Sequence, residues 1–145
     1  MPLITRLFLK TGMVYFLGAL LVGVILQVDS LGIPNLVPTF WHMLMVGWIT
    51  QIIMGVSLWM FPGRIKEESF QNQKWAWLTY AFLNLGLILR FISEPMIILS
   101  EGYHWKILLV ISAILQFGAV LCYVTEIWPR VLSKAQRRKK KKSSR

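Results

Sequence analysis

The two histidines of the sequence, His42 and His104, are the side chains best suited to bind a metal. His42 lies just inside the start of an apolar run over 39–61, and His104 opens a second run over 103–125. If both runs cross a membrane in the same direction, both imidazoles lie at a similar depth near the outer face. Two facing imidazoles form a six-coordinate haem site for electron transfer. The alternative is that each is only an amphipathic residue at the membrane interface.

An apolar stripe follows each histidine at helical spacing. These stripes could clamp a flat apolar macrocycle, or they could equally contact other helices or lipid. The residues are Val46, Ile49, Ile53, Val56 and Met60 after His42, and Leu108, Ile111, Leu115, Gly118 and Cys122 after His104.

Arg90 lies about one turn inside the predicted outer interface, on a stripe with Thr79, Leu83, Gly86 and Glu94. A charge at membrane depth is costly and normally faces the bundle interior with a partner. One interpretation makes Glu94 that partner, as an i, i+4 pair. The other has Arg90 bind a haem propionate, because a guanidinium matches a carboxylate in a fork geometry.

Composition predicts the elements that position these residues. The chain is 56% hydrophobic and only 15% charged, with a mean hydropathy of +0.58. Four apolar runs, over about 11–28, 39–61, 75–92 and 103–125, are long enough to span a bilayer. The breaks between them are turn-like, including Glu94-Pro95 before the fourth run. We predict an all-α four-helix transmembrane bundle over 1–129 and a basic tail over 130–145.

The basic residues predict the orientation of this bundle. Arg and Lys precede the first run, lie between the second and third, and follow the fourth, whereas the loops over 29–38 and 95–102 carry none. By the positive-inside rule, both termini are cytoplasmic and the chain is a multi-pass protein of the inner or plasma membrane. Tryptophans near the run ends fit an aromatic belt. Cys122 is the single cysteine, so an internal disulfide is excluded.

Nine of the 16 Lys and Arg residues lie from Arg130 onward. A like-charge run without apolar periodicity is typical of a disordered segment. Beside a membrane span, its expected partners are anionic lipid headgroups. Nucleic acid is not an expected partner.

The segment from Trp41 to Arg64 resembles the second helix of subunit I of haem–copper oxidases and nitric oxide reductases. The matching positions are His42, Gly47, Trp48, Gly55 and Pro62. The resemblance implies that His42 is an axial ligand of a low-spin b-type haem on the outer side. Independently, Gly47, Gln51 and Gly55 form a stripe opposite His42 that lets another helix approach closely.

The chain departs from that family in its size and its ligand set. With four spans and two histidines, it cannot build the copper site or the active-site haem, so it is not a stand-alone oxidase. The prediction is an electron-transfer subunit that binds one haem b through His42 and His104, with Arg90 on a propionate. It would work with other membrane or electron-carrier subunits. The alternative is a haem-free accessory or scaffold subunit of a larger respiratory-type complex.

Overall fold

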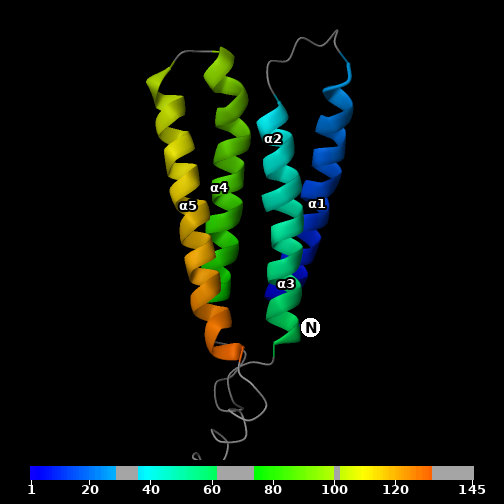
Figure 1. Ribbon diagram of the computed structural model, residues 1–145, viewed down its shortest axis with the longest axis vertical. Coiled ribbons are helices and arrows are strands. Elements are labelled where there is room, and N and C mark those ends of the chain that lie inside the picture. Colours follow the sequence, from blue (N-terminus) through cyan, green and yellow to red (C-terminus); the bar gives the residue numbers. More distant parts are fainter. Residues whose placement is uncertain (29–35, 62–73, 100–101, 132–145) are drawn as a thin grey trace, which may run out of the picture.

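Four long helices run antiparallel in the computed structural model, which describes residues 1–28, 36–61, 74–99 and 102–131 (Figure 1). The second of them, Val37–Met60, changes its helix type twice and is called the second span below. The elements are α1 (Leu3–Ile25), α2 (Val37–His42), the π-helix η2 (Met43–Thr50), α3 (Gln51–Met60), α4 (Lys74–Leu99), α5 (Tyr103–Ile127) and the 3-10 turn η4 (Trp128–Arg130).

The prediction of an all-α, four-helix transmembrane bundle is confirmed. Four helices are long and apolar enough to cross a membrane, and the described residues contain no strand. Large apolar side chains are exposed all along the outer surface, for example Leu17 on α1 and Phe117 on α5. In a membrane such surfaces face lipid, so the chain is a multi-pass membrane protein.

Two predicted helix limits were wrong. The first helix begins at Leu3 and includes Arg6 and Lys10, which are exposed and long enough to reach the interface from within a helix. The third helix continues through Pro95 to Leu99. Proline inside a helix removes one backbone donor and crowds the preceding turn, which predicts a break, but a helix in a membrane bundle tolerates both.

The second span, which contains the π-helix η2, buries the predicted packing stripe and not the stripe after His42. In a π-helix each backbone bond runs from i to i+5, so the faces drift away from α-helical spacing. Ile53 and Met60, predicted to share a stripe with His42, are exposed. Gly47, Gln51 and Gly55, the predicted packing stripe, are buried.

The helices pair as two hairpins, which Figure 1 shows side by side. The N-terminal hairpin consists of α1 and the second span, and the C-terminal hairpin of α4 and α5. A Cβ on Gly47 would lie 2.7 Å from Cγ of Tyr15, and one on Gly86 would lie 3.1 Å from the Ser112 carbonyl oxygen. Glycine therefore lets the two helices of each hairpin approach closely, as predicted for Gly47.

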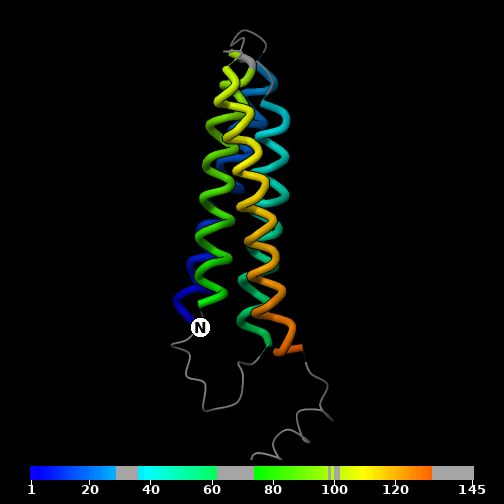
Figure 2. Tube along the Cα trace, turned by 90° about the vertical axis from the view of Figure 1, so that its left-hand side faces the viewer, coloured from blue at the N-terminus to red at the C-terminus, as the bar shows by residue number. Residues whose placement is uncertain are grey.

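Both hairpins turn at the same end of the bundle, and His42, Glu94 and His104 lie near that end. We call it the histidine end. Figure 2 shows the N-terminus and the end of α5 together at the opposite end, as an even number of spans requires. The contacts between the two hairpins are called the seam below. A buried apolar cluster crosses it: Ile4, Phe8, Met54, Leu58, Ala76, Leu83, Leu87 and Ala119.

Candidate functional site

His42 lies in the seam at the histidine end, where the last turn of α2 faces α4. Its Nδ1 is 2.7 Å from the Pro38 carbonyl oxygen and 2.9 Å from Oε1 of Glu94. Its Nε2 is 2.7 Å from a terminal nitrogen of Arg90. The structure therefore brings together two of the three predicted site residues, His42 and Arg90, and adds Glu94 to them.

The partners of His42 determine which ring nitrogen carries the proton. A guanidinium has only donors, so Nε2 of His42 must accept from Arg90. The proton of a neutral imidazole then lies on Nδ1, which donates toward Pro38 and Glu94. Metal-ligating histidines are likewise held by one ring N–H on a carboxylate or backbone carbonyl. In His42 the other nitrogen is occupied by Arg90.

Glu94 is held at the centre of the cluster. Oε2 accepts a hydrogen bond of 2.7 Å from the hydroxyl of Thr39, and Oε1 lies 3.7 Å from Arg90. The side chain of Glu94 is 8% exposed and that of Thr39 is 1% exposed. A buried carboxylate needs such donors and an opposite charge, because an unpaired charge at this depth is costly. The predicted i, i+4 pair of Arg90 and Glu94 is thus present, within a larger network.

Arg90 also ties the cluster to α5. Its Nε donates to Oγ of Ser112 at 3.3 Å, and that hydroxyl donates to the Gly86 carbonyl at 2.7 Å. Ser112 is fully buried where α4 and α5 approach closely at Gly86. The cluster of Thr39, His42, Arg90, Glu94 and Ser112, called the polar cluster below, therefore joins the second span to both helices of the C-terminal hairpin.

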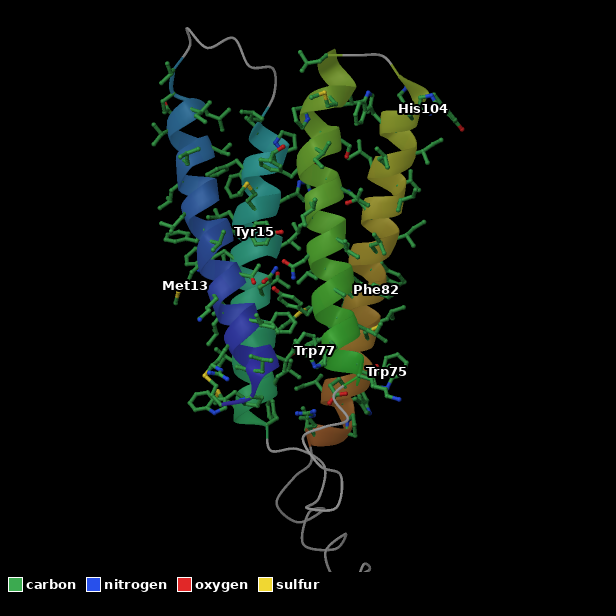
Figure 3. All side chains as sticks on the ribbon, turned by 180° about the vertical axis from the view of Figure 1, so that it is seen from behind. Met13, Tyr15, Trp75, Trp77, Phe82 and His104 are labelled. Carbon is green, nitrogen blue, oxygen red and sulfur yellow. The ribbon has the colours of Figure 1, made fainter. Side chains whose placement is uncertain are left out.

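His104 lies apart from this cluster. It is exposed at the beginning of α5, and Figure 3 shows its side chain directed away from α4. The predicted stripe after it is packed only in part, because Ile111 is exposed while Cys122 is buried, and Ser112 and Ala119 beside the stripe are buried. The two histidines share an end of the bundle, as predicted, but the structure does not bring them face to face.

Three members of the site were missed in the sequence. Thr39 lies one turn before His42 on the same face, and that spacing was its only signal. Ser112 is one of several hydroxyls in an apolar run, and nothing in the sequence distinguishes it. Pro38 contributes a backbone carbonyl, which no side-chain pattern reveals.

Metal-ligand chemistry elsewhere in the described part of the chain is sparse. Those residues contain no group of three or more His, Cys, Asp or Glu side chains able to hold a metal ion. Cys122 is buried with a free thiol on α5, in keeping with the predicted packing role. A haem needs only axial ligands, so it is His42 that bears on the cofactor prediction.

No protein-family model, curated protein or solved structure matches the chain. The resemblance of the second span to an oxidase helix therefore stays a prediction that rests on the residues named for it.

Proposed function

We propose that the chain is an integral membrane electron-transfer subunit of a respiratory-type complex, in which His42 ligates one low-spin b-type haem near the outer face. The supporting observation is that two acceptors lie within hydrogen-bonding distance of Nδ1 of His42. Pro38 and Glu94 accept from this nitrogen at 2.7 and 2.9 Å, so Nε2 is the nitrogen that presents a lone pair. A haem iron, when bound, supplies a site that accepts and passes on one electron.

The other residues of the polar cluster have distinct roles in this proposal. Thr39 positions Glu94, and Glu94 fixes the ring orientation and tautomer of His42. Arg90, whose terminal nitrogen lies 2.7 Å from Nε2, would pair with a propionate of a bound haem, because a guanidinium matches a carboxylate well. Ser112 is a second partner for Arg90.

The chain offers one axial ligand. His104 is exposed on the far side of α5 and does not fit as the second ligand. In this proposal the second ligand of a low-spin iron comes from another subunit, which is why the proposal places the chain in a complex. This revises the predicted His42 and His104 pair.

A second candidate function is that of a haem-free accessory subunit. It is favoured by the 2.7 Å contact between Arg90 and Nε2 of His42, which satisfies the imidazole without any ligand. In this case the polar cluster serves to join the two hairpins. The two candidates differ in what occupies Nε2.

An optical spectrum separates the two candidates. The full chain is expressed with haem supplied, and oxidised and dithionite-reduced spectra are compared. Because the chain alone leaves one axial position open, we expect a Soret band that shifts with carbon monoxide. His42→Ala removes the band, while His104→Ala, the matched control, leaves it intact. A wild-type protein without a Soret band establishes the haem-free alternative, and loss of the band in His104→Ala restores the bis-histidine arrangement.

The proposed orientation needs its own test, because the basic tail beyond Val131 lies outside the described residues. We expect a reporter that works only in the cytoplasm to be active when it is fused after Arg145. The reason is that the basic segments flank the end of the bundle that holds the N-terminus and the end of α5. Activity of a periplasmic reporter at that position reverses the assignment. Binding of the tail to anionic lipid, on the same side, belongs to this proposal.

A further inference from the structure

Gln51 is an unusual residue for the interior of a membrane bundle. It begins α3, directly after the π-helix, and is fully buried. Its Nε2 donates to Oδ1 of Asn84 across the seam at 2.9 Å, and Asn84 donates in turn to the Tyr80 carbonyl at 2.8 Å. The other half of the amide, Oε1, is buried without a hydrogen-bond donor from the described residues.

The register of α1 against the second span shows what lies beside Gln51. A Cβ on Gly47 would meet the ring of Tyr15, and one on Gly55 would meet Phe8. Figure 3 marks Tyr15 on α1. Gln51 lies midway between the two glycines on the same face, so it is level with Thr11, midway between the two aromatic residues. This places the amide oxygen at the level of a second polar pair.

The second polar pair, Thr11 and Tyr80, has one hydroxyl proton that is not used in the bond between them. Oγ1 of Thr11 and the Tyr80 hydroxyl are 2.7 Å apart and share one hydrogen bond. Each hydroxyl carries one proton, so one bond between them uses one proton and leaves the other available. At one level of the bundle, therefore, α1 and α4 carry a spare donor and α3 carries an acceptor that lacks a donor.

We infer that a single water molecule is bound at this level and bridges the Thr11–Tyr80 pair to Oε1 of Gln51. The water accepts the spare hydroxyl proton and donates one of its own to the amide oxygen. An acceptor left unpaired in the interior is destabilising, and a bridging water supplies the hydrogen bond that it lacks. The site is independent of the haem proposal, because it lies below the polar cluster and shares no residue with it.

The direct test is NMR on the full wild-type chain in lipid nanodiscs, with bulk water as the probe. We expect a nuclear Overhauser peak between water and the Thr11 methyl group, with the sign of a long-lived water. The control is the methyl group of Thr79, a fully buried threonine whose hydroxyl donates to the Trp75 carbonyl of its own helix, whereas Thr11 is only partly buried. A Thr11 methyl signal without a water peak overturns the proposal.

A double-mutant cycle gives a second, energetic test. Gln51→Met and Thr11→Val remove two groups that share no direct bond, so any coupling between them passes through the water. We expect the unfolding equilibrium constant of the double mutant to deviate from the product of the single effects by more than about twofold. The control cycle of Gln51→Met with Thr79→Val should be additive. Additivity in both cycles overturns the proposal, and if a variant does not fold, the wild-type measurement decides.

Discussion

The two hairpins are held together differently from the helices within each hairpin. Inside a hairpin, helices approach through glycine, as at Gly47 against Tyr15 and Gly86 against Ser112, and the Ser112 hydroxyl also joins α5 to α4 by hydrogen bonds. Across the seam, an apolar cluster is supplemented by side-chain hydrogen bonds and by the charges of Arg90 and Glu94. These bonds are Thr39–Glu94, His42–Glu94, His42–Arg90, Gln51–Asn84, Thr11–Tyr80 and Ser57–Tyr123.

This difference has a physical reason. In lipid, apolar side chains gain little by leaving one apolar surface for another, so association depends on close packing or on hydrogen bonds. Glycine packing works only where backbones approach closely over several turns. Polar side chains can bridge helices that lie farther apart, and they also specify the register. We infer that the hairpins are the rigid units and that the seam is where a ligand or a partner subunit can change the structure.

The largest effect is expected from Arg90→Leu in the seam. The substitution leaves Glu94 buried without its opposite charge, which costs about 3–5 kcal/mol in unfolding free energy. Glu94→Gln keeps groups that can bond to Thr39 and His42, and should cost about 1–3 kcal/mol. Equilibrium unfolding in bicelles measures both losses.

The matched control for that pair is Lys106→Leu, which removes an exposed charge at the same end of the bundle and should change stability little. Equal losses of stability for Arg90→Leu and Glu94→Gln would show that Arg90 and Glu94 act only as an ion pair. If haem is bound, only Arg90→Leu should also weaken its retention.

The packing inside a hairpin is tested by Gly86→Ala. The new Cβ would lie 2.9 Å from Cγ of Gln116 and 3.1 Å from the Ser112 carbonyl, so α4 and α5 must separate. Overpacking lowers the free energy of unfolding by about 1–3 kcal/mol. The higher helix propensity of alanine offsets about 1 kcal/mol of this loss. Gly118→Ala is the matched control in the same hairpin, because its nearest neighbour, Phe82, lies 3.5 Å away. It should be neutral or stabilising, and equal responses at the two glycines would exclude close packing as the cause.

The sequence predicted the bundle well because its main determinants are local. Apolar run length and turn residues between the runs specify four spans, and the stripe of Thr79, Leu83, Gly86, Arg90 and Glu94 is the packed face of α4. The limits of the helices were less predictable. Pro95 and the charges of Arg6 and Lys10 were read as helix ends, although a membrane helix can include all three.

The site was predictable only in part. A charge at membrane depth identified Arg90 and Glu94 without any knowledge of their neighbours. The partner of His42 was not predictable, because it depends on which hairpin surfaces face each other. Equal depth suggested His104, but depth says nothing of the direction in which a side chain points around its helix.

The smallest effect is expected from Tyr123→Phe, near the terminal end of the seam. The Tyr123 hydroxyl lies 2.7 Å from Oγ of Ser57 and links α5 to α3, but both groups are neutral and only half-buried. Hydrogen bonds between membrane helices average about 0.6 kcal/mol, since each group finds other partners when the helices separate. Tyr103→Phe is the control, because Tyr103 is 73% exposed at the opposite end of the same helix. A loss for Tyr123→Phe as large as that for Arg90→Leu would mean that the stability of the seam depends on the number of its hydrogen bonds. A loss of about 0.6 kcal/mol would mean that the charged residues of the polar cluster contribute most of that stability.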